Sequence, residues 1–107
     1  VLAEMGKLFA EFFAGKGLIG RLGGEEFGVF LVGCPRSEAT EIFEDFKNKV
    51  SNHPIRYMQS EILITISCGI HSGLFTKQTL LTDILKKADA ALYKAKNSGR
   101  NCVVVQD

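Results

Sequence analysis

The sequence predicts an α/β fold, of the α+β kind, in which helices flank a partly antiparallel sheet. Two segments, residues 3–13 and 79–98, carry apolar side chains at helical spacing. Two short apolar runs on either side of a Gly-Gly pair indicate a β-hairpin within residues 18–32. A hairpin placed among helices favours a mixed sheet over a doubly wound parallel one, since parallel strands are joined through crossovers and not through tight turns.

The first helix is predicted over residues 3–13. Its apolar stripe is formed by Met5, Leu8, Phe9, Phe12 and Phe13. Gly15 and Gly17 follow and are expected to end the helix. The hairpin comes next, with strands at residues 18–22 and 27–32 and with Glu25 and Glu26 at or beside its turn.

The second half of the chain is predicted to contain two helices and two strands. Ser37 is a candidate N-cap for a helix that Pro54 stops. Residues 62–70 alternate between bulky and mostly small side chains, which predicts a strand with one bulky face. The helix over residues 79–98 is expected to end at Gly99, and the β-branched run at 103–105 predicts a last strand.

Composition limits the classes of function. A chain of 107 residues that is 46% apolar has the material for one domain with a modest core. The formal net charge of +1 gives no overall attraction to nucleic acid or membrane surfaces, so we expect neither a nucleic-acid polymer nor a membrane as a partner. No apolar run has the length that spans a bilayer. Three widely spaced cysteines without a CxxC pair argue against a disulfide framework or a zinc site, and predict a cytoplasmic location.

The acidic hairpin carries the most informative chemistry. Gly23 and Gly24 leave a bare backbone that a polyphosphate can approach closely. Glu25 and Glu26 repel each other unless a cation lies between them, and Mg²⁺ binds one or two carboxylates together with phosphate oxygens. The segment therefore fits a metal–triphosphate site. It equally fits a solvent-exposed turn with two hydrated glutamates, and the segment alone does not decide between the two.

Basic residues gather at the end of the last predicted helix. Lys94, Lys96 and Arg100 lie there, and the spacing of four between Lys96 and Arg100 predicts that both cations share one face and can hold one anionic group. Cations near a helix C-terminus also complement the helix dipole without any ligand. On this segment alone, the interpretation without a ligand is favoured.

Three motifs together resemble the GGDEF family of diguanylate cyclases. Residues 23–27, GGEEF, are similar to the family signature. Residues 65–70, TISCGI, resemble its TxSxGI strand, and residues 88–96, ADAALYKAK, with GRN at 99–101 resemble its ADxALYxAK…GRN ending. The motifs occur in the family's order over essentially the whole chain.

The resemblance implies a fold and an activity. The fold would be a nucleotidyl-cyclase, ferredoxin-like sheet, largely antiparallel and flanked by helices. The activity would be condensation of two GTP into cyclic di-GMP and pyrophosphate for bacterial second-messenger signalling. Each domain holds one GTP in this family, so the expected protein partner is a second copy of the same domain. The alternatives are a non-catalytic module that binds GTP or cyclic di-GMP, and a purely structural dimerisation module.

The resemblance also implies roles for individual residues. Glu25 would be the catalytic acid–base residue and, with Glu26, would bind Mg²⁺ or Mn²⁺. The substrate-binding positions would be Leu2 at the guanine, Gly23 and Gly24 along the phosphates, and Lys96 and Arg100 on the triphosphate.

Residues 1–107 are then expected to be a single GGDEF domain without its N-terminal strand and first helix. That opening segment carries the family's metal-binding Asp and the Asn and Asp that recognise guanine. We therefore expect residues 1–107 alone to make no cyclic di-GMP, and the intact protein to make it.

Overall fold

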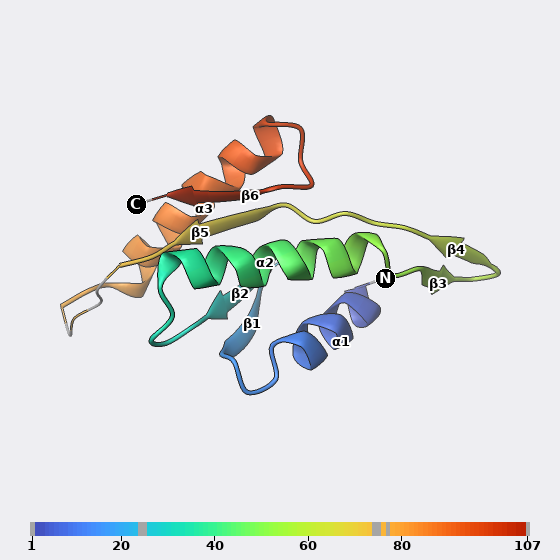
Figure 1. The fold of residues 1–107 in the computed structure, drawn as a ribbon, viewed down its shortest axis with the longest axis horizontal. Helices are drawn as coiled ribbons and strands as arrows, with labels where there is room; N and C mark the ends of the chain where they lie inside the picture. The colour runs from blue at the N-terminus through green and yellow to red at the C-terminus, as the bar shows by residue number, and fades with distance from the viewer. Residues whose placement is uncertain (1, 24–25, 74–75, 77, 107) are drawn as a thin grey trace.

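The computed structural model describes residues 2–23, 26–73, 76 and 78–106 of the chain (Figure 1). The elements run in the order α1 (Leu2–Phe12), β1 (Leu18–Gly23), β2 (Glu26–Phe30), α2 (Arg36–Ser51), β3 (Ile55–Tyr57), β4 (Ser60–Ile62), β5 (Cys68–His71), α3 (Leu81–Asn97) and β6 (Val103–Gln106). The described strands form three two-stranded sheets, of which β1–β2 and β3–β4 are antiparallel and β5–β6 is parallel. The predicted α/β class is confirmed.

The three predicted helices and the acidic hairpin are confirmed. β1 and β2 pair in antiparallel register from Leu18 opposite Phe30 to Gly23 opposite Glu26. The last helix ends at Asn97, and Gly99 follows with a φ of +103°. A left-handed residue just past the last turn favours glycine, which has no Cβ to clash there.

The expected N-cap of α2, Ser37, is wrong by two residues. The helix begins at Arg36, and Pro35 occupies the N-cap position without a side-chain cap hydrogen bond. The carbonyl of Pro35 accepts the N–H of Ala39 at 2.9 Å, so the helical hydrogen bonds start before Ser37. The proline ring already fixes φ near the helical value, and the observed φ is −64°.

The strand predicted over residues 62–70 is only partly present. Ile62 ends β4, residues 63–67 are extended without strand pairing, and β5 begins at Cys68. The alternation itself is real, because Ile62, Ile64 and Ile66 pack against the core while Leu63 is 66% exposed. Side-chain periodicity records which face is buried, whereas a strand also needs a hydrogen-bonded neighbour.

A second hairpin, β3–β4, was not predicted. Its two three-residue strands pair from Ile55 opposite Ile62 to Tyr57 opposite Ser60. Met58 and Gln59 connect them, and Met58 has a φ of +58°. The hairpin extends away from the rest of the molecule at one end of its long axis (Figure 1). Short strands joined by residues other than Asn or Gly lack the usual hairpin signal.

The core is an aromatic cluster between α1 and α2. Phe13, Phe46, Val50 and Ile55 are almost completely buried. The ring centroids of Phe46 lie 4.6 Å from Phe9, 4.9 Å from Phe12 and 5.1 Å from Phe13. These separations fall within the range at which aromatic rings attract each other. The apolar stripe predicted over residues 3–13 is therefore the face of α1 that packs against α2.

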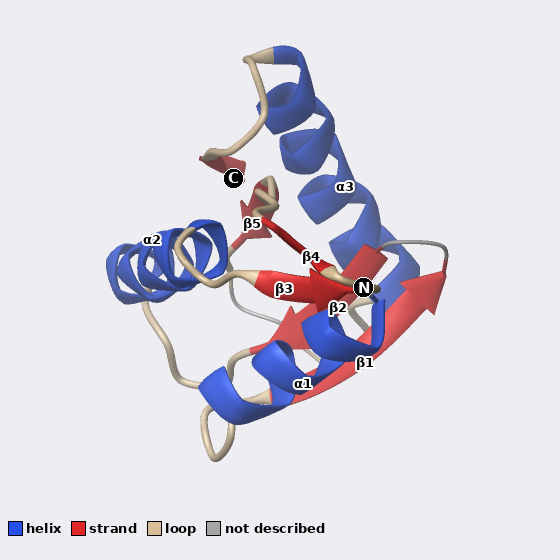
Figure 2. Ribbon diagram, turned by 90° about the vertical axis from the view of Figure 1, so that its right-hand side faces the viewer, coloured by secondary structure: helices blue, strands red, loops and turns tan. Residues whose placement is uncertain are grey.

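The β5–β6 sheet lies between α2 and α3 (Figures 1 and 2). Gly69 of β5 lies directly against the backbone of α3, so that a Cβ at this position would clash with main-chain atoms of Ala88 and Leu92. Ala91 and Ala95 of α3 are completely buried. Small residues on both sides let the helix and strand approach closely, which fixes where the end of α3 lies relative to β5.

Candidate active site

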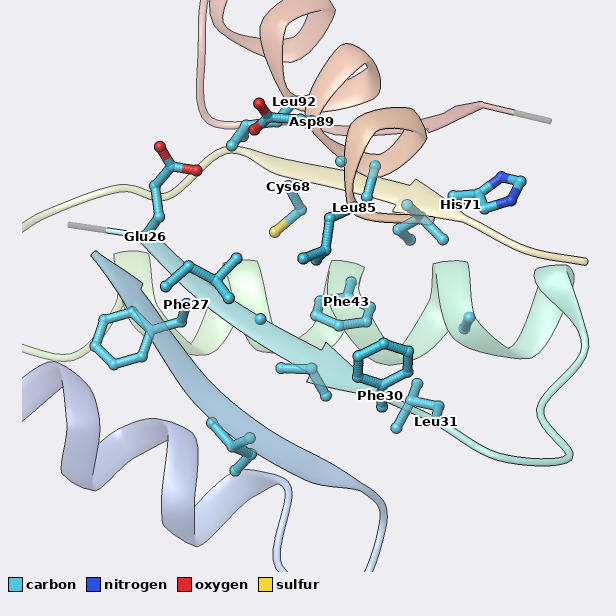
Figure 3. A pocket seen from close by; sticks show the side chains of 18 of the residues that line it. Glu26, Phe27, Phe30, Leu31, Phe43, Cys68, His71, Leu85, Asp89 and Leu92 are labelled. Carbon is cyan, nitrogen blue, oxygen red and sulfur yellow. The ribbon is translucent and has the colours of Figure 1, made fainter. Parts of the chain in front are cut away.

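A large cavity of about 1720 Å³ lies between the β1–β2 hairpin, α2, β5 and α3 (Figure 3). Its lining is largely apolar and includes Phe27, Phe30, Phe43, Leu85 and Leu92. Polar and charged side chains join this lining from several elements, among them the start of β2 and the end of α3. Small-molecule sites usually enclose about 300–1,000 Å³, so only the part of this cavity where polar groups converge is a candidate ligand site.

The acidic side of the site comes from the hairpin. Glu26 is the first residue of β2, lies opposite Gly23 in the register, and is exposed at the cavity. Its carboxylate points from the start of β2 toward the side of the cavity that α3 covers (Figure 3). The register shifts between Arg21 and Gly23, so the strand pairing is irregular just before the turn. Gly24 and Glu25 lie outside the described residues.

The basic side of the site comes from the end of α3. Lys96 lies in the last turn of the helix, and both Lys96 and Arg100 are exposed and line the cavity. The prediction that they share one helical face is wrong, because the helix has ended before Arg100. Gly99 turns the chain out of the helix, and Arg100 reaches the same cavity from the following turn.

The turn after α3 has a defined hydrogen-bond pattern. The N–H of Arg100 donates to the carbonyl of Ala95 at 3.1 Å, and the N–H of Ser98 donates to the same carbonyl at 3.3 Å. The Arg100 bond is the 6→1 bond of a Schellman motif, in which a left-handed glycine, here Gly99, closes the helix. Arg100 and Asn101 continue in the left-handed region, with φ values of +62° and +47°.

For two of the remaining candidate residues, the structure gives the position in the backbone. Leu2 is the first residue of α1, and Gly23 is the last residue of β1.

Two further residues that the sequence analysis gave no role, Asp89 and His71, also line the cavity (Figure 3). Asp89 precedes Lys96 by seven residues, two helical turns, and this spacing is the signal that places both on the cavity side of α3. In the part of the chain that the structure describes, no group of three or more His, Cys, Asp or Glu side chains is arranged to hold a metal.

Cys68 contributes a thiol whose sulfur points into the cavity (Figure 3). Burial raises the pKa of this thiol to about 12, and the nearby carboxylate of Glu44 acts in the same direction. A low-dielectric wall disfavours the thiolate, since a charge there loses its hydration. Cys68 is thus a neutral part of the apolar lining at physiological pH.

The family model described as diguanylate cyclase, GGDEF domain, matches residues 1–102. The chain belongs to the GGDEF family of diguanylate cyclases. Among curated relatives of this GGDEF chain, the probable diguanylate cyclase DgcF of Escherichia coli K12 is 32% identical over 104 residues, covering 94% of this chain and 33% of the relative. Diguanylate cyclase A of Treponema denticola is 34% identical over 105 residues, covering 98% of this chain and 28% of the relative. The chain thus spans a third or less of the length of these relatives.

Solved GGDEF structures share the fold. The active GGEEF domain of a diguanylate cyclase from Vibrio cholerae is 30% identical, with a TM-score of 0.80 over 99% of this chain and 66% of that chain. The diguanylate cyclase SiaD from Pseudomonas aeruginosa, in complex with its activator SiaC, is 28% identical, with a TM-score of 0.87 over 97% of this chain and 39% of that chain. The predicted family and cyclase fold are confirmed. Within the described ranges, no helix has the length and apolar character needed to cross a membrane.

Proposed function

We propose that this chain forms the GTP-binding and catalytic part of a diguanylate cyclase that condenses two GTP into cyclic di-GMP and pyrophosphate. One observation carries the proposal. Glu26 from the hairpin and Lys96 and Arg100 from the end of α3 line the same cavity, although they are about seventy residues apart in the sequence. Family membership supplies the reaction.

The proposed site places basic side chains on one side of the phosphates and acidic side chains, with their cation, on the other, as phosphoryl transfer requires. Lys96 and Arg100 would bind the triphosphate oxygens, and the acidic hairpin would face the same phosphates through a cation. Gly23 and Gly24 would let the triphosphate approach the backbone, and Leu2 would form an apolar wall at the guanine. Catalysis of this kind depends mainly on positioning and on neutralising developing negative charge.

The carboxylates present fit a magnesium site. Mg²⁺ binds through one or two carboxylates and completes its shell with water and phosphate oxygens, so it does not require three protein donors. Glu25 and Glu26 are the residues that would hold Mg²⁺, or Mn²⁺, at the hairpin. When bound, the metal would neutralise phosphate charge and lower the pKa of a coordinated hydroxyl.

The reaction needs two copies of the domain. Glu25 would accept the proton of the 3′-hydroxyl of its own GTP. That oxygen would bond to the α-phosphorus of the other GTP, and the bond from this phosphorus to pyrophosphate would break. Each domain holds one GTP, so both phosphodiester bonds of the product form only when two copies face each other. Since GTP is an intracellular metabolite, we place this domain in the cytoplasm.

The test compares the intact wild-type protein with its Glu25→Gln variant, incubated with GTP and Mg²⁺, with the product measured by chromatography. We expect cyclic di-GMP from the wild type and none from the variant. The melting temperature should change little, because the substitution is isosteric and removes no apolar group, and such changes usually cost about 0.5 kcal/mol or less. Full turnover by the variant contradicts the catalytic role of Glu25.

A second measurement separates the alternatives. A ligand that binds only the folded state raises the melting temperature. A GTP- and Mg²⁺-dependent shift without turnover by the wild type would indicate a non-catalytic binding module. No shift at all would indicate a structural dimerisation module.

A further inference from the structure

The turn that carries Arg100 is attached to a distant part of the chain. The backbone N–H of Asn101 donates a hydrogen bond of 3.1 Å to the side-chain oxygen of Ser67, 34 residues away in the sequence. Ser67 lies at the end of the extended run before β5, is half-buried, and lines the same cavity as Arg100. The bond therefore connects the start of β5 to the segment after α3.

The attached turn adopts an unfavourable backbone conformation. Arg100 and Asn101 are both left-handed, with φ values of +62° and +47°. Asparagine tolerates this region, whereas arginine rarely adopts it. Such a conformation persists only where its surroundings impose it. Here the N–H of Arg100 is held by the Ala95 carbonyl at 3.1 Å, and the next N–H is held by Ser67 at 3.1 Å.

Two further hydrogen bonds lie next to the Asn101–Ser67 bond. The thiol of Cys102 donates to the Ala95 carbonyl at 3.4 Å, and the N–H of Cys68 donates to the Cys102 carbonyl at 2.9 Å. The Cys102 thiol thus joins the segment after Asn101 to the end of α3, and the Cys68–Cys102 backbone bond joins the same segment to the start of β5. Of the two bonds that join this segment to the start of β5, the one at Asn101 depends on a side chain that mutation can remove.

We propose that Ser67 is a positioning residue of the triphosphate site, whose hydroxyl holds the Arg100–Asn101 turn so that the Arg100 guanidinium faces the bound phosphates. The proposal rests on the proposed function, in which Arg100 binds the triphosphate. Lys96 is oriented by α3 itself, but Arg100 lies beyond the helix end and takes its direction from the turn. Fixing a binding group in its bound geometry lowers the entropic cost of binding.

The test uses two variants of nearly equal shape in the intact protein, Ser67→Thr and Ser67→Val. Threonine keeps the hydroxyl acceptor, and valine replaces it with a methyl group. Both side chains are larger than serine by a similar volume, so any steric effect is the same in the two variants. We expect Ser67→Val to raise the KM for GTP about tenfold over Ser67→Thr, with kcat changed less than about twofold. Ser51→Ala is the control, because the Ser51 hydroxyl bonds locally to the Asn48 carbonyl and Ser51 is not part of the cavity lining that the described residues form.

A double-mutant comparison with Arg100→Ala shows whether Ser67 acts through Arg100. If it does, Ser67→Ala raises KM in the wild-type background and has no further effect when Arg100 is already alanine. Equal KM values for the Thr and Val variants, or additive effects of the two alanine substitutions, would overturn the proposal. If Arg100→Ala raises KM while Ser67→Val does not, the phosphate site stands and only the role of Ser67 fails. If Arg100→Ala leaves KM unchanged, both fail.

Discussion

The ring of Phe9 in α1 stacks on the ring of Phe27 in β2, with the two centroids 4.5 Å apart and the ring planes inclined by 21°. Phe27 directly follows Glu26, so this pair ties the acidic end of the hairpin to the first helix. Phe9 also contacts Phe46 of α2, with a centroid separation of 4.6 Å. The carboxylate at the cavity is therefore supported by the aromatic core through the adjacent residue.

We expect this pair to be energetically coupled. In a double-mutant cycle of Phe9→Leu and Phe27→Leu, the coupling should be about 0.5–1.5 kcal/mol, because a close aromatic pair contributes beyond the area it buries. The free energy of unfolding is measured by urea denaturation of the four proteins. Strict additivity would show that the two rings stabilise the fold independently.

Gly69 should not tolerate a side chain. Gly69→Ala is expected to destabilise the fold by about 3 kcal/mol or more, since the new Cβ meets the backbone of α3, which cannot rotate away. Gly6→Ala is the matched control in α1, where a Cβ meets no atom within 4 Å. That substitution should stabilise by about 0.5–1 kcal/mol through helix propensity. Similar unfolding free energies for the two variants would contradict the close approach of α3 and β5.

The two lysines of the last helical turn should differ in function. Lys96→Ala is expected to raise the KM of the intact protein for GTP about tenfold, because one charge-assisted phosphate contact is lost. Lys94→Ala removes the same charge from the same turn, and Lys94 lies outside the cavity lining of the described residues. Its KM should stay within about twofold of wild type. Equal effects would indicate general electrostatic attraction instead of a specific contact.

Alkaline pH should destabilise the fold partly through Cys68. Its folded-state pKa is about 12, above the ordinary value of 9.0. The unfolded chain therefore loses this proton first, and the stability that the neutral thiol contributes is complete below pH 9 and is lost as the pH rises toward 12. Denaturation of wild type and Cys68→Ala from pH 8 to 11 checks this. Parallel pH profiles would show that Cys68 does not contribute.

The elements that the sequence predicted well are those that local chemistry determines. The apolar stripe of α1 and the glycine that ends α3 are decided by residues within a few positions of each other. The β3–β4 hairpin was missed because Met58 and Gln59 form its turn without Asn or Gly. Residues 63–67 kept the predicted alternation but not the predicted pairing, because pairing depends on a neighbour distant in sequence.

The candidate site was likewise predicted where local sequence determines it and missed where the packing of distant segments does. The GGEEF segment and the basic helix end were each ambiguous alone, and the fold supplies what spacing did not by placing Glu26, Lys96 and Arg100 around one cavity. The spacing of Lys96 and Arg100 predicted one shared helical face, whereas Arg100 lies past the helix and lines the cavity from the following turn. No pattern in the sequence indicates that Ser67 bonds to Asn101, because that contact depends on how β5 and α3 pack.

The cavity between β2 and β5 also bears on how the chain behaves at high concentration. In the described part of the chain, β2 pairs with β1 and β5 with β6, each along one edge, and both strands line the cavity. A strand edge presents backbone donors and acceptors to any extended chain, and natural edges are usually shielded by charge or proline. Glu26 at the start of β2 supplies one charge, but Phe27–Phe30 and Cys68–Ile70 contain neither charge nor proline. Intermolecular strand pairing should therefore compete with folding, and the yield of refolded chain should fall as its concentration rises.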